Sequence, residues 1–357
     1  GNGVVVDPKA LLDEIVYVKE KGIEPKLMVS GRAHVIMPYH IILDGALSGH
    51  QGNLAAGSTR RGIAPVYADK MYRNGIRMVD LLEPDVFREK LEKGYAFSKG
   101  LIEKALGQSL DISIDEIFDS YLSYGQLLKS YICDTSVELY NAHKSGKSIL
   151  FEGAQGISLD VDHGIYPYTT SSNTAAGHIS TGTGVSFRDI DRIIGVVKAY
   201  LSRVGEGPLP TEMHDDAAVS LREKGNEYGA PTGRPRRVGW LDLIQVRQAV
   251  RVNGLTEIAL TKLDVLNGFK ELSVCVAYDV DGAHITEMPA SLTQYRKAKP
   301  IYETLPCWGD LPDNIWDKGF NALPDTLKDY IAFIERAVDC PIKIVSVGPQ
   351  RHETIIR

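Results

Sequence analysis

Cysteine is scarce in this chain, and its four cysteines lie far apart. Cys133, Cys275, Cys307 and Cys340 form no C-x-x-C pair and have no histidine at metal-binding spacing. This pattern argues against a disulfide framework and a zinc site, and it indicates free thiols in a reducing compartment. No apolar run reaches the roughly 20 residues of a membrane-spanning helix, and nothing at the start resembles a signal peptide. We therefore expect a cytoplasmic protein with no membrane partner.

An excess of positive charge is also lacking. The 357 residues carry 40 Lys and Arg against 46 Asp and Glu, which gives a formal net charge of -6. Proteins that coat nucleic acid are normally basic, so we predict no nucleic-acid partner. The hydrophobic content of 43% and the charged content of 24% are typical of a globular protein. Because no internal repeat or long linker is present, we interpret residues 1–357 as a single domain.

Apolar runs between amphipathic segments predict an α/β fold with a mostly parallel central sheet flanked by helices. Buried strands are predicted at residues 148–151, 193–200, 258–260 and 342–345, and helices at 241–250 and 327–338. Near-continuous apolar character suits strands that are buried on both faces, as we expect for 193–200. In such folds, ligands bind at the carboxyl ends of the parallel strands.

Two further segments depart from this alternation. Residues 86–147 predict a helical insertion, with helices over 89–106 and 114–143 and a possible break at Gly125. Residues 271–288 predict an antiparallel hairpin that turns at Asp281-Gly282. At the start of the chain, Asp7-Pro8 is typical of a helix N-cap followed by the first helical residue.

The most informative stretch is FEGAQGISLDVDHGIYPYTTSSNTAAG, residues 151–177. Gly153 and Gly156 allow a ligand to approach the backbone closely, and Gln155 offers both a donor and an acceptor to a heterocycle. The hydroxyl and amide groups of residues 169–173 are possible donors to phosphate or ribose oxygens. An ordinary polar loop has a similar composition, so composition alone leaves both interpretations open.

Thr261-Lys262-Leu263-Asp264 follows a predicted strand. The carboxylate of Asp264 can accept two parallel N–H bonds from the edge of guanine, which adenine cannot offer, and would select GTP over ATP. The stem of Lys262 could cover the face of the base. A Lys–Asp pair on the surface is the alternative interpretation.

Two basic segments suggest anionic ligands. Residues 229–237, GAPTGRPRR, concentrate three arginines in a loop stiffened by Gly and Pro, and arginine binds carboxylates and phosphates bidentately. Lys70 and Arg73 are three residues apart, so we expect both on one side of a helical turn, where they could clamp a phosphate. A solvated basic turn and a solvated helix face are the respective alternatives.

The Asp160-Val161-Asp162-His163 segment has a composition that invites a metal site. On a strand, the two carboxylates would point to one side and His163 to the other. We therefore interpret His163 as a structural histidine paired with a carboxylate and assign no metal to this segment.

The order of these motifs resembles the adenylosuccinate synthetase family. The resemblance rests on FEGAQG followed by LDVDHGIYPYTTSSN, on GIAPVYADKMYR at residues 62–73, and on the 229–237 and 261–264 segments. It extends from Gly1 to Arg357. It implies a P-loop-NTPase-like fold and a ligase that joins IMP to L-aspartate in the first committed step of AMP synthesis from IMP. By the same resemblance, GTP would be the co-substrate and Mg²⁺ the cofactor. In this family, GTP phosphorylates the purine 6-oxygen, the aspartate amine then displaces that phosphate, and GDP and phosphate are released.

The resemblance also implies the residues of the site. Lys70 and Gln155 would act in catalysis, and IMP would be bound by Thr59, Arg73, Gln155, Thr170 and Arg234. L-Aspartate would be bound by Val204, Ala230, Pro231, Thr232, Gly233, Arg234 and Arg236. GTP would be bound by Arg236, Lys262, Leu263, Asp264, Ser346, Val347 and Gly348. In the family, Arg73 is supplied across the two-fold axis of a homodimer.

The chain departs from the family pattern in five places. It contains no counterpart of the family's Gly-rich G-D-E-G-K-G loop, which supplies the catalytic Asp and the metal ligands, nor of the segment with the catalytic His. We therefore expect residues before Gly1 to be missing and assign no metal ligand. The alternative is a truncated, catalytically inactive nucleotide-binding fragment. A GTPase-like regulator would need a Walker loop, which is absent too. Arg60, Ala64 and Pro231 replace the residues usual in the family.

Overall fold

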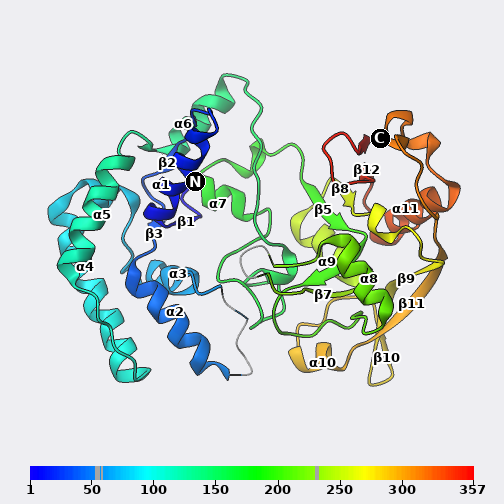
Figure 1. Cartoon of the computed structure of the whole chain (residues 1–357), viewed down its shortest axis with the longest axis horizontal. Helices are drawn as coiled ribbons and strands as arrows, with labels where there is room; N and C mark the ends of the chain where they lie inside the picture. Colours follow the sequence, from blue (N-terminus) through cyan, green and yellow to red (C-terminus); the bar gives the residue numbers. More distant parts are fainter. Residues whose placement is uncertain (53–56, 58, 230–232) are drawn as a thin grey trace. The chain divides into compact units, whose positions relative to one another are not determined.

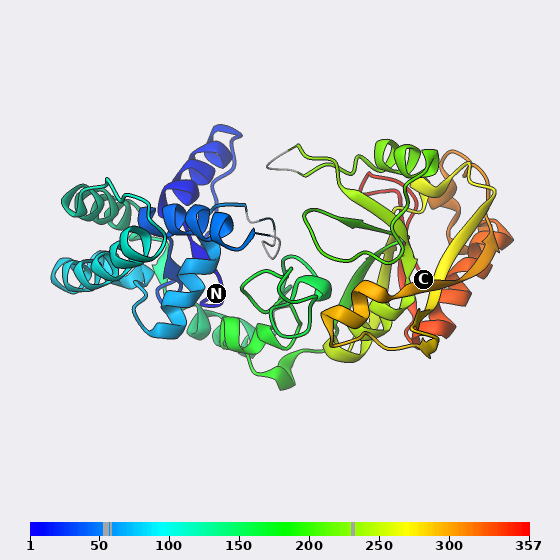
Figure 2. The same ribbon diagram turned by 90° about the horizontal axis from the view of Figure 1, so that it is seen from below.

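The computed structural model describes residues 1–52, 57, 59–229 and 233–357. The contacts between Cα atoms divide the chain into two compact units. Unit 1 consists of Gly1–Asp162 and Pro167–Asp189, and unit 2 of His163–Tyr166 and Ile190–Arg357. Both units contain helices and strands (Figures 1 and 2). The interpretation of residues 1–357 as a single domain stays a prediction.

Unit 1 is mainly helical and contains two short parallel strand pairs. Strand β1 (Val5–Val6) pairs with β3 (His34–Val35), and β2 (Val29–Ser30) pairs with β4 (Ile132–Cys133). The helices are α1 (Pro8–Glu20), α2 (Pro38–His50), α3 (Ile63–Tyr72), α4 (Pro84–Gly100), α5 (Ile114–Leu128), α6 (Thr135–Lys144) and α7 (His178–Thr183). Short helical turns lie at Met78–Leu82, Leu101–Ala105, Ile157–Leu159 and Phe187–Asp189. Helix α1 begins as predicted, since the Asp7 carboxylate accepts hydrogen bonds from the amides of Lys9 and Ala10.

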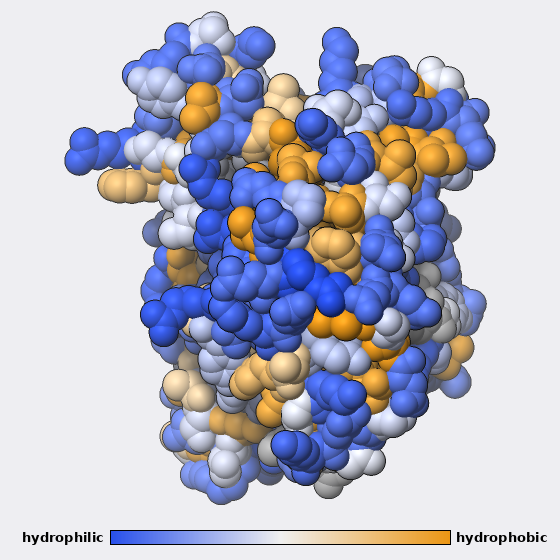
Figure 3. Space-filling model, turned by 90° about the vertical axis from the view of Figure 1, so that its left-hand side faces the viewer, coloured by the Kyte–Doolittle hydropathy of each residue, from blue (hydrophilic) through white to orange (hydrophobic). Residues whose placement is uncertain are grey.

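The helical character predicted for residues 86–147 is confirmed, because α4, α5 and α6 occupy most of this range. The inner faces of α4 and α5 bury Phe87, Leu91, Ile117 and Leu128 in one cluster with residues of α2. Their outer faces are rich in charged residues, and Figure 3 shows a largely hydrophilic surface with separate hydrophobic patches on this side of the molecule. Such a pattern is expected for amphipathic helices that cover a core.

Unit 2 contains two sheets. In the first, β5 (Ile194–Lys198), β8 (Glu257–Thr261) and β12 (Ile342–Ser346) are parallel, and β13 (Thr354–Ile356) pairs antiparallel with β12. The second contains β6 (Tyr200–Arg203), β7 (Arg237–Asp242), β9 (Glu271–Val280), β10 (Ala283–Ile285) and β11 (Lys299–Pro306). The helices of unit 2 are α8 (Asp216–Gly225), α9 (Leu243–Asn253), α10 (Leu292–Lys297) and α11 (Asp325–Val338). Short helical turns lie at Asp264–Leu266, Ile315–Lys318 and Phe320–Ala322. Parallel strands with flanking helices confirm the predicted α/β class.

Several predicted elements are confirmed in unit 2. Strands β8 and β12 coincide with the predicted runs, and α11 buries Leu327, Ile331, Ile334 and Val338 as its periodicity indicates. The hairpin of β9 and β10 turns at Asp281 and Gly282, which have φ values of 52° and 85°. Two successive left-handed residues are the conformation that Asp-Gly favours in a two-residue hairpin turn. Among the described residues, no helix combines the length and the apolar character that crossing a membrane requires.

The predicted strand at residues 148–151 is wrong. These residues form neither strand nor helix, and Leu150 is 86% exposed. An apolar run becomes a strand only when a neighbouring strand pairs with its backbone groups, and no described strand pairs with this one.

The burial predicted for residues 193–200 is also wrong in part. Strand β5 lies at the edge of its sheet, where Val196 is 75% exposed, and the chain passes into β6 of the second sheet after Ala199. The helix predicted from residue 241 begins only at Leu243, because Leu241 and Asp242 end β7 and the Asp242 carboxylate caps α9.

Gly125 is a close-packing position, and the predicted break there is wrong. Helix α5 continues through it to Leu128. A Cβ atom at Gly125 would lie 2.5 Å from the Leu81 carbonyl oxygen and 2.7 Å from the Leu81 Cβ. The glycine therefore allows the short helix at Met78–Leu82 to approach α5.

We expect Gly125→Ala to destabilise the protein by roughly 1–3 kcal/mol, because the added methyl group forces backbone atoms apart in a packed core. Urea unfolding measures this change. Gly100→Ala is the matched control, because a Cβ at Gly100 meets nothing within 4 Å. Equal unfolding midpoints for Gly125→Ala and wild type would contradict the packing role.

Candidate active site

The carboxyl ends of β8 and β12 bring two of the predicted ligand segments together in unit 2. The two strands are parallel neighbours, so the segment 261–264 after β8 and the segment 346–348 after β12 leave the same edge of the sheet. Strand β5 is parallel to β8 on the side opposite β12, so it ends at the same edge of the sheet. Directly after β5, the Ala199 amide donates to the Thr261 carbonyl at 2.9 Å. This is the edge at which parallel α/β sheets bind ligands.

Asp264 lies half-buried at the start of a short helical turn. Burial raises the pKa of its carboxyl group, and the neighbouring Glu353 carboxylate adds to this, while backbone amides and Lys262 act in the opposite direction. Leu263 is fully buried and anchors the segment. Lys262 has a left-handed backbone, with φ of 65°, and its ammonium group donates to the Gly225 carbonyl at 3.1 Å. The ammonium group of Lys262 thus links this segment to the end of α8.

The Ser346-Val347-Gly348 turn is held by its own hydrogen bonds. The Ser346 hydroxyl donates to the Gly348 carbonyl at 3.0 Å, and the Val347 amide donates to the Glu353 carbonyl at 3.0 Å. A Cβ atom on Gly348 would lie 2.4 Å from a carboxylate oxygen of Glu353. A larger residue at position 348 would therefore have to displace the Glu353 carboxylate, which packs against this turn.

The arginines of the 229–237 loop have different surroundings. Arg237 makes a bidentate ion pair with Glu212 and donates to the Gly207 carbonyl at 2.7 Å. Arg236 is paired with Glu227, and Arg234 is exposed. The guanidinium group of Arg237 therefore holds the chain around residues 205–212. The binding of an anionic ligand by this loop stays a prediction.

The remaining residues predicted to bind L-aspartate are partly described. Ala230, Pro231 and Thr232 lie outside the described residues. Gly233 has φ of 63° and donates its amide to the Gly229 carbonyl at 2.7 Å, and Gly229 donates to the Arg234 carbonyl at 2.8 Å. The side chain of Val204 is 44% exposed. Val204 precedes Gly207, whose carbonyl accepts a hydrogen bond from Arg237, by three residues.

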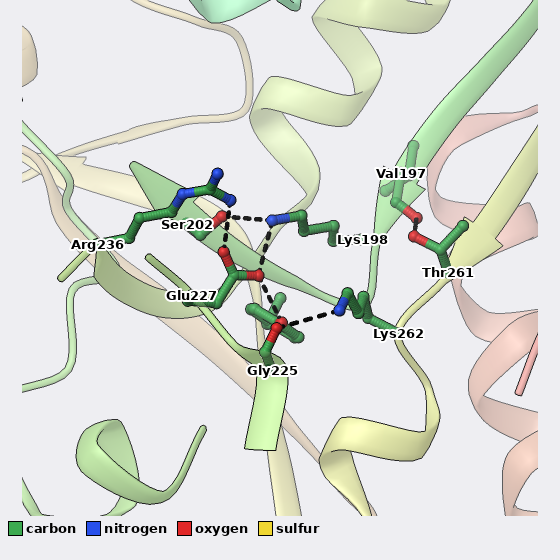
Figure 4. A network of polar contacts seen from close by, with 9 residues as sticks. Val197, Lys198, Ser202, Gly225, Glu227, Arg236, Thr261 and Lys262 are labelled. Carbon is green, nitrogen blue, oxygen red and sulfur yellow. Dashed lines mark hydrogen bonds and ion pairs between the residues drawn. The ribbon is translucent and has the colours of Figure 1, made fainter. Parts of the chain in front are cut away.

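A buried carboxylate next to this loop was missed by the sequence analysis. The side chain of Glu227 is 1% exposed and accepts hydrogen bonds from Lys198 at 2.7 Å, Tyr200 at 2.6 Å and Arg236 at 2.7 Å (Figure 4). Lys198 also donates to the Ser202 hydroxyl at 2.6 Å. The contacts join residues up to 29 positions apart, so no local spacing could have indicated them. The only available signal was the position of Lys198 near the end of a predicted strand.

Burial opposes the charged form of Glu227, but hydrogen bonds from Lys198 and Tyr200 and the charges of its neighbours outweigh it, and its pKa falls to about 2. The pKa of the Lys198 ammonium group is lowered, first by burial and then by the nearby Arg236 and Lys262, although Glu227 acts in the opposite direction. The cluster around Glu227 thus contains one ionised carboxylate among three basic side chains, Lys198, Arg236 and Lys262.

In unit 1, Asp160 organises the stretch that carries Gln155 and Thr170. The buried Asp160 carboxylate accepts from the amides of Asp162 at 2.9 Å, Thr174 at 2.5 Å and Ala175 at 3.1 Å. The Thr170 amide donates to the Leu159 carbonyl at 2.9 Å. Gln155 is exposed with φ of 61°. Residues 162 and 174–175, which lie on the two sides of Thr170 in the sequence, are thereby held by the Asp160 carboxylate.

The strand geometry expected for residues 160–163 is wrong, because they form turns instead. Asp160 is engaged with backbone amides, and Asp162 accepts from the Asn173 side chain at 2.5 Å. Within the described ranges, no three His, Cys, Asp or Glu side chains gather as metal ligands. The predicted pairing of His163 with a carboxylate stays a prediction.

Lys70 and Arg73 lie at the carboxyl end of α3. Lys70 is half-buried, and burial followed by the charge of Arg77 lowers the pKa of its ammonium group. Arg73 caps the helix with φ of 66° and is exposed. The backbone turns left-handed at Arg73, directly after the last residue of α3, and the expectation that Lys70 and Arg73 face one side stays a prediction. Thr59 is exposed, and Gly62, with φ of 77°, directly precedes α3 and donates its amide to the Asp44 carboxylate at 2.9 Å.

The predicted site residues are thus distributed over both units. Unit 1 carries Thr59, Lys70, Arg73, Gln155 and Thr170, whereas unit 2 carries Val204, Gly233, Arg234, Arg236, Lys262, Leu263, Asp264, Ser346, Val347 and Gly348.

Comparison with known proteins extends these observations. A model of the adenylosuccinate synthetase family matches residues 1–355. The chain is 49% identical over 359 residues to the adenylosuccinate synthetase of Geobacter sulfurreducens and 47% identical over 357 residues to that of Bacillus thuringiensis. In both cases the match covers 100% of this chain and 82% of the relative.

Solved structures give the same result. The fully ligated adenylosuccinate synthetase of Plasmodium falciparum matches with a TM-score of 0.92 and 34% identity, over 100% of this chain and 84% of that one. Succinoaminodeoxyadenylate synthetase of cyanophage S-2L shares the fold at 21% identity, with a TM-score of 0.57, over 100% of this chain and 75% of that one.

Proposed function

The chain belongs to the adenylosuccinate synthetase family, and we propose that it joins IMP to L-aspartate, using GTP and releasing GDP and phosphate. The observation that carries this proposal is the match to the family along residues 1–355. The arrangement of the 261–264 and 346–348 segments at one edge of the sheet gives independent support, because nucleotides bind at such edges.

The proposed reaction has two steps. The γ-phosphoryl group of GTP is transferred to the 6-oxygen of IMP, with loss of the proton from purine N1, which gives 6-phosphoryl-IMP and GDP. The amine of L-aspartate then attacks carbon 6 and expels phosphate. The first step is needed because the hypoxanthine carbonyl oxygen is a poor leaving group until it is phosphorylated.

We propose that Asp264 and its neighbours recognise guanine. Asp264, Lys262 and Leu263 follow β8, and Ser346, Val347 and Gly348 follow the adjacent β12. A half-buried carboxylate beside a tight glycine turn offers an acceptor to the guanine N–H groups in a partly desolvated place, where a hydrogen bond discriminates most strongly.

The anionic substrates are proposed to bind through basic and amide groups. We assign L-aspartate binding to Arg234 and Arg236, together with Val204, Gly233 and the segment 230–232. Arg236 is also assigned a contact with GTP. IMP is assigned to Thr59, Arg73, Gln155, Thr170 and Arg234, with Lys70 and Gln155 acting in catalysis. Arginine forks suit carboxylate and phosphate groups.

The proposal includes Mg²⁺, which would neutralise charge on the transferred phosphoryl group. The described residues offer no cluster of carboxylates to hold it, so they do not fit the ion by themselves, and no step is derived through it. We also propose a cytoplasmic location and a homodimer in which Arg73 serves the site of the other subunit. The exposure of Arg73 at the end of α3 is compatible with that role.

An activity assay tests the function directly. The protein, expressed from its complete coding sequence, is incubated with IMP, L-aspartate, GTP and Mg²⁺, and adenylosuccinate and GDP are quantified by chromatography. Equal amounts of the two products are expected, and omission of any one substrate should abolish both. Binding of the substrates without turnover would instead favour the inactive nucleotide-binding fragment.

Asp264→Asn tests the guanine assignment. The substitution replaces an acceptor with a donor that opposes the guanine N–H groups, so we expect kcat/KM for GTP to fall roughly tenfold or more. Xanthosine triphosphate, whose base carries an acceptor at this edge, should be used better by the variant than by wild type. Asp313→Asn, at an exposed aspartate of the same unit, is the control. GTP kinetics equal to wild type would remove Asp264 from the site.

Mixing two inactive variants tests whether Arg73 acts across a homodimer. Arg73→Leu and Gln155→Ala should each be inactive alone, whereas a heterodimer has one site in which both residues are intact. Random exchange of subunits should restore roughly a quarter of the wild-type activity. Native mass spectrometry verifies that heterodimers form. A mixture that contains heterodimers but stays inactive would disprove the assignment in trans.

A further inference from the structure

We propose that Glu227 is a positioning residue that holds Arg236 in the orientation required to bind the carboxylate of L-aspartate. The inference rests on the proposed function, because it takes Arg236 as the residue that contacts the substrate. Glu227 itself is buried and is not assigned any contact with substrate.

Glu227 holds both the backbone and the side chain of Arg236. The Arg236 amide donates to the Glu227 carbonyl at 2.9 Å, and the Arg236 guanidinium Nη1 donates to the Glu227 carboxylate at 2.7 Å. On the other side, Arg222 Nε donates to the Arg236 carbonyl at 2.9 Å. These contacts restrict Arg236 at both ends of its side chain. Glu227 occupies one of the five N–H donors of the guanidinium group, which leaves others for a ligand.

Glu227 is itself held rigidly. Lys198 Nζ and the Tyr200 hydroxyl both donate to its Oε1 atom, whereas Arg236 donates to its Oε2 atom, so the two carboxylate oxygens have separate tasks (Figure 4). The chain makes room for this arrangement at Gly225, where a Cβ atom would lie 2.4 Å from the Tyr200 hydroxyl and 3.1 Å from the Glu227 Cγ. The carboxylate therefore has a single well-defined orientation.

The charges explain why a carboxylate is needed at this position. Lys198 and Arg236 donate to the same group and would repel each other without it, and Lys262 is a third cation nearby. A free arginine side chain also loses considerable conformational entropy when it binds a ligand. By ordering Arg236 before the substrate arrives, Glu227 removes part of this cost from binding.

A purely electrostatic role would have the opposite effect on affinity. A negative charge near an anionic substrate weakens its binding, so removal of the charge alone should improve the affinity for L-aspartate. The positioning role predicts that removal of Glu227 weakens binding instead. The two roles can therefore be separated by one variant that changes the charge of the side chain at position 227 and another that changes its length.

Glu227→Gln removes the charge at nearly constant shape, and Glu227→Asp keeps the charge but is one methylene shorter and cannot span both Lys198 and Arg236. We expect both variants to raise the KM for L-aspartate roughly tenfold, with a much smaller change in the KM for IMP. Steady-state kinetics of the complete protein measure both constants. Glu303→Gln, at an exposed glutamate of the same unit, should match wild type.

The outcomes distinguish the possible explanations. A wild-type KM for L-aspartate in Glu227→Asp, together with a lowered KM in Glu227→Gln, would overturn the positioning role in favour of simple electrostatics. If Glu227→Gln does not fold, Glu227→Asp still decides the question, because its charge is unchanged. A fall in kcat and in the concentration of active sites at constant KM values would show only a structural role, and would likewise overturn the inference.

A double-variant cycle separates this inference from the proposed function. Arg236→Leu alone should raise the KM for L-aspartate, and Glu227→Gln should add little in the Arg236→Leu background, because the residue that it positions is gone. If Arg236→Leu leaves this KM unchanged, the assignment of Arg236 in the proposed function fails. If Arg236→Leu raises it and Glu227→Gln adds its full effect, that assignment stands and the positioning role of Glu227 fails.

Discussion

The parallel pairing of β8 with β5 and β12 is the constraint on which the site of unit 2 depends. Parallel neighbours end at the same edge of a sheet, so the residues that follow each strand meet there whatever their separation along the chain. Asp264 and Gly348 are far apart in the sequence, yet both segments leave that edge. Lys198, the last residue of β5, connects the same edge to Glu227.

Buried carboxylates organise loops within each of the two units. Asp160 accepts three backbone amides in unit 1, Glu227 accepts two cations and a hydroxyl in unit 2, and Asp242 caps α9 while it accepts from Tyr278. A desolvated carboxylate is tolerated only when donors surround it, and each of these residues therefore fixes several segments at once. Loops that carry ligand-binding groups thereby acquire a defined shape without regular secondary structure.

The division of roles among the arginines of the 229–237 loop follows from the same principle. Arg237 is engaged with Glu212 and with backbone carbonyls, so it shapes the site. Arg236 is held by Glu227 through one donor and retains others, whereas Arg234 is exposed. Residues of one type in one short segment thus differ in function because each faces a different partner.

The sequence by itself determined the elements and motifs that depend on neighbouring residues. Strands β8 and β12, helix α11 and the Asp281-Gly282 turn follow from periodicity and local conformational preference. The family followed from the order of motifs such as FEGAQG and GIAPVYADKMYR. Only the tertiary structure decided what depends on a distant partner: the exposure of Leu150, the edge position of β5, and the contact of Gly125 with Leu81. The buried cluster around Glu227 belongs to this second group, because its hydrogen bonds join strands β5 and β6 to two loop residues, and no pattern within one segment records which groups will meet.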